Sequence, residues 1–419
     1  MTLPPILAAL RKHKSGVVLI TLQIALTLAI VCNAVFIIGQ RVATVQRPTG
    51  MDEQNLFLIQ QQIVNAPTGN DAASLERRYA MLRSDLMTLR GLPDVASAAP
   101  VRSLPLLQSS NNGGVGLQPN QDHSTATTTF YGGDEDLLKT LGVRLVAGRN
   151  FTASEITHDD RGGDWQPPVA IVTRALADQL FPAGDALGKT VYFNGGAVPT
   201  TIIGIVARLQ TPNVGWGSDY NWNSTLLPTF PNDTYTRTAV RAKPGQLDAA
   251  MRDARQALVA ANPQRVIRNG FAGFIGIYPY SDIRARAYRA DIGMALLMGV
   301  ICLVLLCVTG AGIVGLTSFW VGQRRRQIGI RRALGATRTD ILRYFQAENL
   351  LIAGMGVALG AALAVGLNLW LMQQFAMDRM SLLYVLAGVV ALLALGQGAV
   401  LAPALRASRV SPVEATRSV

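Results

Sequence analysis

The chain has 419 residues, of which 49% are hydrophobic and only 15% are charged. Soluble domains usually carry about 25% charged residues, so this composition argues against a protein that is soluble throughout. The net charge of +12 does not indicate nucleic-acid binding either, because residues 41–291 hold 24 basic and 22 acidic side chains. The excess of basic residues lies beside long uncharged runs, as at the cytoplasmic ends of membrane spans.

Four runs without Asp, Glu, Lys or Arg are long enough to cross a membrane, at 15–40, 292–323, 349–377 and 380–405. A helix needs about 20 apolar residues to do so, and soluble helices of this length usually keep a polar face. We therefore predict transmembrane helices at 16–40, 291–321, 347–373 and 381–404. The first is interpreted as an uncleaved anchor, because its apolar stretch exceeds the about 7–15 residues of a signal peptide.

The distribution of Lys and Arg predicts the orientation of these spans. The N-terminal segment 1–15, the loop 322–346 and the tail 405–419 carry the excess of basic residues and are expected to be cytoplasmic. The segment 41–290 and the short turn 374–380 are then expected on the opposite, outer side of the membrane. The three cysteines, Cys32, Cys302 and Cys307, all lie in predicted spans, so the external domain is expected to fold without disulfides.

The external segment has the pattern of an α+β domain. A strand at 55–64, a helix at 71–90 and a strand at 95–101 form one unit, and similar elements return at 236–243, 247–261 and 265–268. Two strand–helix–strand units predict a ferredoxin-like part, about 50–110 and 233–280. Residues 111–232 are predicted to be an inserted, strand-rich subdomain. Residues 281–290 are predicted to form a stalk, as a helix continuous with the second span.

The sequence AGDALGKT (183–190) resembles a phosphate-binding loop but departs from it. Such a loop begins with Gly, whereas Ala183 stands at that position here. The following VYFNGG predicts a strand, where a phosphate loop needs a helix N-terminus. We therefore predict a turn that exposes Lys189 and binds no nucleotide.

The sequence shows few signs of a metal site, a catalytic site or a proton relay. The histidines are far apart, and the acidic stretch that follows His158 is at best a weak Ca²⁺ candidate, so we predict no metal site. No catalytic triad or carboxylate pair is evident, and we predict that the chain is not itself an enzyme. The spans contain no ionisable group near their centres, so the energy for any transport is expected to come from elsewhere. Trp216, Tyr220 and Trp222 form a cluster that either contacts a partner or packs its loop on its own domain.

The most distinctive segment of the sequence is RRRQIGIRRALGATRTDILR (324–343), which contains seven arginines and one acidic residue. Two glycines bracket a short helix in which apolar residues alternate with arginines, and Thr337 with Asp340 predicts the start of a new helix. This pattern predicts a compact amphipathic element on the cytoplasmic side. The alternative is an interfacial helix whose arginines contact lipid phosphates.

The segment 324–360 resembles the signature of FtsX-like, MacB-type ABC transporter permeases. The closing PALRASRVSPVEATR (403–417) and the external segments 136–152, 168–182, 185–191 and 200–212 are also similar to that family. In the family, the arginine loop carries the coupling helix that docks on a cytoplasmic ATPase. The corresponding residues here are Arg325, Arg326, Gln327, Ile328, Gly329, Ile330, Arg331, Arg332, Ala333, Leu334 and Gly335. Gln327 stands where the family commonly has Glu.

The resemblance implies a four-span permease in the bacterial inner membrane, with both termini cytoplasmic. Only about 15 residues precede the first span, which implies a separate ATPase dimer that binds ATP and Mg²⁺, while this chain binds no cofactor. A second permease copy or a related permease, membrane lipid, and possible contacts with a periplasmic adaptor and an outer-membrane channel are the other implied partners. Gly356 and Gly360 fit either helix pairing between chains or packing within the chain.

The implied function is efflux of small molecules or peptides, by mechanotransmission from ATP hydrolysis to the periplasmic domain. Two alternatives use a similar architecture: extraction of lipoproteins from the membrane, and signalling to a cell-wall hydrolase or a sensor kinase without transport. The sequence does not name the substrate.

Overall fold

The computed structural model describes residues 14–158, 167–213, 221–231, 235–267, 275–375 and 378–409. The chain divides into two compact units, a helical unit from Met1–Gln46 and Ala290–Val419 and a globular unit formed by Arg47–Arg289.

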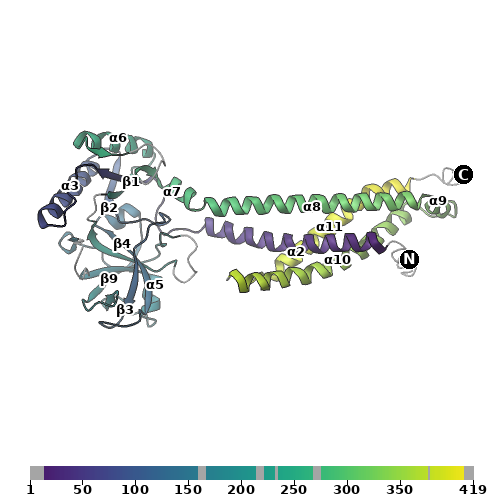
Figure 1. Cartoon of the computed structure of the whole chain (residues 1–419), viewed down its shortest axis with the longest axis horizontal. Helices are drawn as coiled ribbons and strands as arrows, with labels where there is room; N and C mark the ends of the chain where they lie inside the picture. Colours follow the sequence, from purple (N-terminus) through teal and green to yellow (C-terminus); the bar gives the residue numbers. More distant parts are fainter. Residues whose placement is uncertain are drawn as a thin grey trace. The chain divides into compact units, whose positions relative to one another are not determined.

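The helical unit contains four long helices, which run alongside one another in Figure 1. They are α2 (Lys14–Val45), α8 (Arg289–Gln323), α10 (Arg338–Phe375) and α11 (Leu382–Ser408), with the short α9 (Arg325–Ala333) between α8 and α10. All four long helices have the length and apolar composition to cross a membrane, with mean hydropathies of 2.2–2.8. The prediction of a four-span membrane protein is confirmed.

Two glycines of α10 permit it to pack closely on α2. A Cβ added at Gly356 would lie 2.8 Å from Ile24 Cβ, and one added at Gly360 would lie 2.8 Å from the Ala25 carbonyl oxygen. Small residues allow helix backbones to approach in this way. Of the two interpretations that the sequence left open, the structure shows packing within the chain.

Polar side chains inside the spans bond to neighbouring helices. Asn33 Nδ2 on α2 donates to the Ala364 carbonyl of α10 at 3.0 Å. The Thr27 hydroxyl on α2 lies 2.8 Å from that of Thr309 on α8. Since lipid offers no hydrogen-bond partners, these contacts favour one register of the helices.

The first sheet of the globular unit joins strands from the two ends of that unit. It contains β1 (Leu56–Ile63), β2 (Val95–Pro100), β11 (Tyr235–Ala242), β12 (Arg265–Val266) and β13 (Gly276–Pro279). The spatial order is β12-β1-β11-β2, with every pair antiparallel. This places the fourth strand beside the first and the third beside the second, which is the ferredoxin-like order. The α+β prediction is confirmed for this part.

Two helices, α3 (Ala72–Arg90) and α6 (Leu247–Ala261), form a core with this sheet. They lie together beside β1 and β2 in Figure 1. Leu82 and Leu86 of α3 and Leu258 of α6 are buried with Phe57 and Val240 of the strands. Apolar residues recur every three or four positions along both segments, as at Leu82 and Leu86, which explains why the sequence predicted both helices.

The second sheet lies between β2 and β11 in the chain. Its strands are β3 (Asn112–Gly116), β4 (Ala126–Gly133), β5 (Leu145–Gly148), β6 (Thr157–His158), β7 (Val169–Thr173), β8 (Thr190–Phe193), β9 (Thr200–Val206) and β10 (Ser224–Phe230). The order β4-β3-β8-β9-β7-β10 closes on itself through a β4–β10 pairing, and closure leaves no free edge among these six strands. The short helices α4 (Leu137–Leu141) and α5 (Arg174–Leu180) and a 3₁₀ turn at Ala153–Glu155 connect the strands.

The predicted continuous stalk helix is wrong. The helix α7 (Tyr280–Ala287) ends before Tyr288, whose φ and ψ of −98° and 8° are not helical, and α8 begins at Arg289. Tyr288 is fully buried, and the Arg284 guanidinium lies 5.4 Å from its ring centroid. Burial of the Tyr288 side chain therefore accompanies the interruption of the helical backbone.

Candidate functional site

A local sequence signal determines the C-terminal end of α9. The helix ends at Ala333, and Leu334 is followed by Gly335 at φ 96°, a left-handed conformation that favours glycine. The Gly335 and Ala336 amides donate to the carbonyls of Arg332 and Arg331, which is the hydrogen-bond pattern of a Schellman motif.

The next helix, α10, begins with a reciprocal cap. The Thr337 amide donates to Asp340 Oδ2 at 3.0 Å, and the Asp340 amide donates to Thr337 Oγ1 at 3.2 Å. This arrangement is a capping box with Asp in the place of the usual Glu. Together, the two motifs make the connection from α9 to α10 short and well defined.

One apolar side chain of α9 attaches it to the helical unit, and two others face outward. Ile328 is only 5% exposed and belongs to the same apolar cluster as Ile341 and Phe345 of α10. Ile330 is 47% exposed and Leu334 is 83% exposed. Since residues four apart lie on one face of a helix, Ile330 and Leu334 form an exposed apolar pair.

A buried ion pair stabilises the junction of α8 and α9. Arg324 Nη1 donates to both carboxylate oxygens of Glu348, at 3.0 and 2.9 Å. The Glu348 side chain is 3% exposed and that of Arg324 is 12% exposed. Removing one partner of such a buried pair typically costs about 3–5 kcal/mol, so this contact holds α9 close to α10.

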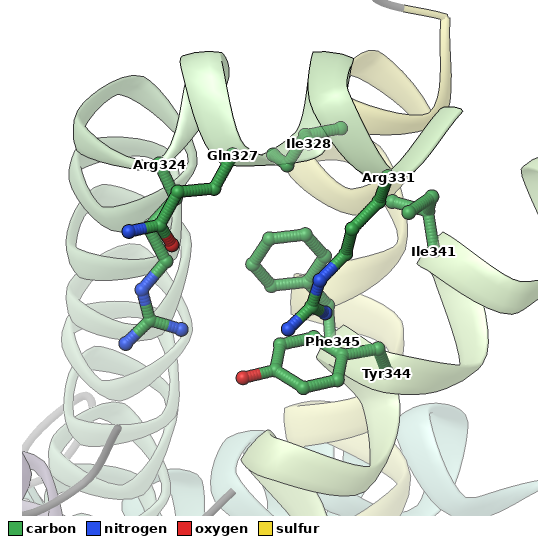
Figure 2. A pocket seen from close by; sticks show the side chains of 7 residues that line it. All are labelled: Arg324, Gln327, Ile328, Arg331, Ile341, Tyr344 and Phe345. Atoms are coloured by element: carbon green, nitrogen blue, oxygen red, sulfur yellow. The ribbon is translucent and has the colours of Figure 1, made fainter. Parts of the chain in front are cut away.

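A pocket of about 130 Å³ lies between α9 and α10 (Figure 2). Its polar lining consists of Arg324, Gln327 and Arg331. The Arg331 guanidinium lies 5.0 Å from the centroid of the Tyr344 ring, a cation–π distance. Ile328, Ile341, Tyr344 and Phe345 complete the lining.

The eleven residues predicted to couple to an ATPase do not all lie at the surface. Ile328 and Gly329 are buried, and Arg332 is partly exposed. The exposed ones are Arg325, Arg326, Gln327, Ile330, Arg331, Ala333, Leu334 and Gly335. The set therefore divides into residues that are buried against the helical unit and residues that are exposed at the surface.

Three residues that hold α9 in place were not predicted from the sequence. They are Arg324, Tyr344 and Glu348, whose contacts are described above. A signal was present for Glu348, because it is the only acid between Asp340 and Asp378 and it borders an uncharged run. An isolated acid at the edge of a span needs a cationic partner.

The aromatic cluster of the globular unit is only partly within the described residues. Trp216 and Tyr220 lie outside them. Trp222 is partly exposed, and its ring centroid lies 4.4 Å from the Arg208 guanidinium carbon. Arg47 lies over the same ring at 6.0 Å, so Trp222 has contacts within its own domain.

The segment that resembles a phosphate-binding loop, residues 183–190, has the predicted geometry. The strand β8 begins at Thr190, directly after the Lys189 of that segment, and Gly184 and Gly188 both have a φ of 80°. Lys189 is exposed and forms an ion pair with Asp185 at 3.1 Å. The segment is a turn that leads into a strand, not a loop that leads into a helix.

Other titratable groups of the globular unit have structural roles. Burial raises the pKa of Asp134 to about 6, although the attraction of Arg90 at 2.5 Å opposes the shift. The His158 ring stacks on Tyr79 at 3.8 Å, and the acidic residues that follow it lie outside the described residues. Within the described part of the chain, no group of three His, Cys, Asp or Glu side chains is arranged to hold a metal.

Two family models match most of the chain. The MacB-like periplasmic core domain matches residues 17–258, and the FtsX-like permease C-terminal domain matches residues 273–412. The chain belongs to the MacB-type, FtsX-like family of ABC transporter permeases. It is therefore a membrane protein with a periplasmic domain, and the resemblance found in the sequence is confirmed.

The curated relatives share moderate identity with the chain. It is 28% identical over 330 residues to the macrolide export ATP-binding/permease protein MacB of Neisseria meningitidis serogroup A, covering 77% of this chain and 46% of the relative. It is 27% identical over 303 residues to MacB 2 of Yersinia pestis bv. Antiqua, covering 70% and 42%. The chain spans less than half the length of these relatives.

Two solved structures are also similar to part of the chain. The periplasmic region of MacB from Actinobacillus actinomycetemcomitans matches with a TM-score of 0.35 and 16% identity, covering 58% of this chain and 96% of that one. The extracellular domain of the transporter YknZ from Gram-positive bacteria matches with a TM-score of 0.31 and 16% identity, covering 51% and 100%.

Proposed function

We propose that this permease couples ATP hydrolysis by a cytoplasmic ABC ATPase to movement of its periplasmic domain. The helix α9 is the docking element, and the exposed pair Ile330 and Leu334 contacts the ATPase. The single observation that supports this role is the division of α9 into a buried anchor, Ile328, and an outward apolar pair. A rigidly held helix with exposed apolar side chains suits transmission of force to the spans.

The orientation follows from the basic residues. The arginines of α9 and of the first turns of α10 support our proposal that this end of the spans faces the cytoplasm of a bacterial inner membrane, with both chain termini on the same side. The ATP and Mg²⁺ belong to the ATPase, and the permease binds neither. The transporter contains two permease chains, either two copies of this one or this one with a related chain.

The transported substrate is proposed to be a small molecule or a peptide. This assignment rests on the relatives, which are named for macrolide export. In that arrangement, a periplasmic adaptor and an outer-membrane channel receive the substrate from the periplasmic domain. Export is excluded if the purified transporter in vesicles moves neither a macrolide nor peptides while it hydrolyses ATP. Co-purification of a lipoprotein would then favour lipoprotein extraction, and co-purification of a cell-wall hydrolase would favour signalling.

The docking role of α9 can be tested by placing charge on its outer face. We expect Ile330→Asp and Leu334→Asp each to lower substrate-stimulated ATP hydrolysis at least tenfold in the assembled transporter in nanodiscs. A carboxylate at a desolvated contact costs more than the about 1.4 kcal/mol to which a tenfold loss corresponds. The ATPase rate and retention of the ATPase on the permease are both measured.

The matched control adds the same charge close by. Thr339→Asp lies in the first turn of α10 and is exposed, so it changes the charge of the loop without touching the outer face of α9. Normal coupling in Thr339→Asp with loss in Ile330→Asp supports docking through α9. Full coupling in both Ile330→Asp and Leu334→Asp would remove this role from the helix.

A further inference from the structure

The pocket between α9 and α10 has a composition that suits an anion. Figure 2 shows Arg324 and Gln327 on one side of the Phe345 and Tyr344 rings, while Arg331 comes from the other side and its guanidinium reaches over the Tyr344 ring. The pocket lies where α8 ends and α10 begins, next to the uncharged parts of both spans. In a membrane this level corresponds to the lipid headgroups.

The guanidinium groups of the pocket have unfilled donor capacity. Arg324 bonds Glu348 through Nη1 alone, which leaves its Nε and Nη2 without a hydrogen-bond partner among the described residues. Arg331 stacks on Tyr344 and has no carboxylate within ion-pair distance in the described part of the chain. Gln327 contributes no charge. Two cations therefore face one carboxylate, and guanidinium groups match the oxygens of a phosphate.

We propose that this pocket binds the phosphate of an anionic phospholipid. The apolar part of the lining favours a lipid over a soluble anion, because Ile328, Ile341 and Phe345 offer the glycerol region and the first methylene groups a surface to lie against. Basic pockets between transmembrane helices are known to suit such headgroups. The site does not depend on ATPase docking, since Ile330 and Leu334 do not line it.

The proposal is tested by native mass spectrometry of the full-length protein in detergent, titrated with phosphatidylglycerol or with phosphatidylcholine. We expect the first phosphatidylglycerol to bind at least about fivefold more tightly than phosphatidylcholine, from about 1 kcal/mol per basic group near the headgroup. Gln327→Glu is nearly isosteric and adds a negative charge to the pocket, and Arg331→Gln removes a positive one. Each is expected to abolish this preference.

Two matched controls make the same changes of charge outside the lining. Gln323→Glu and Arg326→Gln alter exposed residues that lie within four positions of the pocket residues in sequence, and neither lines the pocket. Both are expected to keep the preference for phosphatidylglycerol. Thermal unfolding of all four variants identifies any that fail to fold. If Arg331→Gln is unstable, the lipid preference of Gln327→Glu is compared with that of its control, Gln323→Glu.

Three results would overturn the proposal. One is equal binding of the two lipids by the unchanged protein. Another is an equal loss in the control variants, which would indicate diffuse attraction to the whole arginine loop. The third is displacement of phosphatidylglycerol by millimolar glycerol 3-phosphate or inorganic phosphate, which would identify a soluble anion as the ligand. A failure of the α9 docking experiment leaves these outcomes unchanged.

Discussion

Burial decides what a charged residue contributes, and two ion pairs of α3 show the contrast. Asp85 accepts from Arg265 at 2.6 and 2.7 Å, and their side chains are 5% and 2% exposed. Arg83 pairs with Glu76 on the same helix, but these side chains are 46% and 62% exposed. Exposed pairs usually contribute under about 1 kcal/mol, whereas a buried charge without its partner is strongly destabilising.

We therefore predict that Asp85→Ala loosens the ferredoxin-like sheet, because it leaves the buried Arg265 without the carboxylate that balances its charge. The free energy of opening of β1 and β12 should fall by about 3–5 kcal/mol. Hydrogen exchange of the β1 amides in the full-length protein measures this quantity. Glu76→Ala serves as the control and should change it by less than about 0.5 kcal/mol. Similar changes in the free energy of opening for the two variants would show that the buried pair contributes no more to stability than the exposed one.

At the scale of elements, the local sequence is enough to predict some features, whereas others depend on packing between elements. Gly335, Thr337 and Asp340 specify the end of α9 and the start of α10 through their own backbone geometry, so the sequence was sufficient to predict this turn. The break at Tyr288 was not predictable, because the helical pattern continues through it and the interruption accompanies burial of that ring. The Arg324–Glu348 pair joins two helices, and its geometry likewise depends on packing.

The turn after α9 yields a prediction that separates backbone strain from crowding. Gly335 has a φ of 96°, and no atom lies within 4 Å of the position that a Cβ would take there, so Gly335→Ala meets strain without a clash. We expect hydrogen exchange of the α9 amides to become faster by the equivalent of about 1–2 kcal/mol, with a parallel loss of ATPase coupling.

Gly322 provides the comparison for this prediction. It lies in α8 with the same open surroundings but a helical backbone, so Gly322→Ala should leave α9 unchanged or slow its exchange slightly. Equal exchange in the two variants would mean that the left-handed residue does not determine the geometry of α9.

At the scale of the molecule, hydropathy and strand–helix alternation were enough to predict four spans and an α+β domain. The closure of the second sheet into a ring could not be predicted from the sequence. It depends on the parallel pairing of β4 with β10, in which Thr129 of β4 lies opposite Ser224 of β10, and these residues are far apart in sequence. Short strands with polar loops carry no signal for such a pairing. The proposed docking role of α9 comes from family resemblance, and the separation of its exposed apolar pair from the buried Ile328 required the structure.

The proposed pair of permease chains leads to a prediction for α8. Only 11% of its most apolar window is buried within the chain, against 22–39% for the other three spans, so α8 has the most surface left for a second copy. Gly293, Gly299 and Gly315 of α8 have open space beside them, which permits close approach of another helix. Cys307 lies on the same helix and is exposed.

If two copies meet along α8, copper phenanthroline treatment of native membranes should link them through Cys307, because a disulfide needs Cα atoms within about 7 Å. Cys307→Ser should remove the linked dimer. A cysteine placed on the exposed face of α11 by Val390→Cys, in the Cys307→Ser background, should not restore it, since that face would then contact lipid. Linkage through position 390 and not through Cys307 would assign the pairing surface to α11, and α8 would be the span that faces the bilayer.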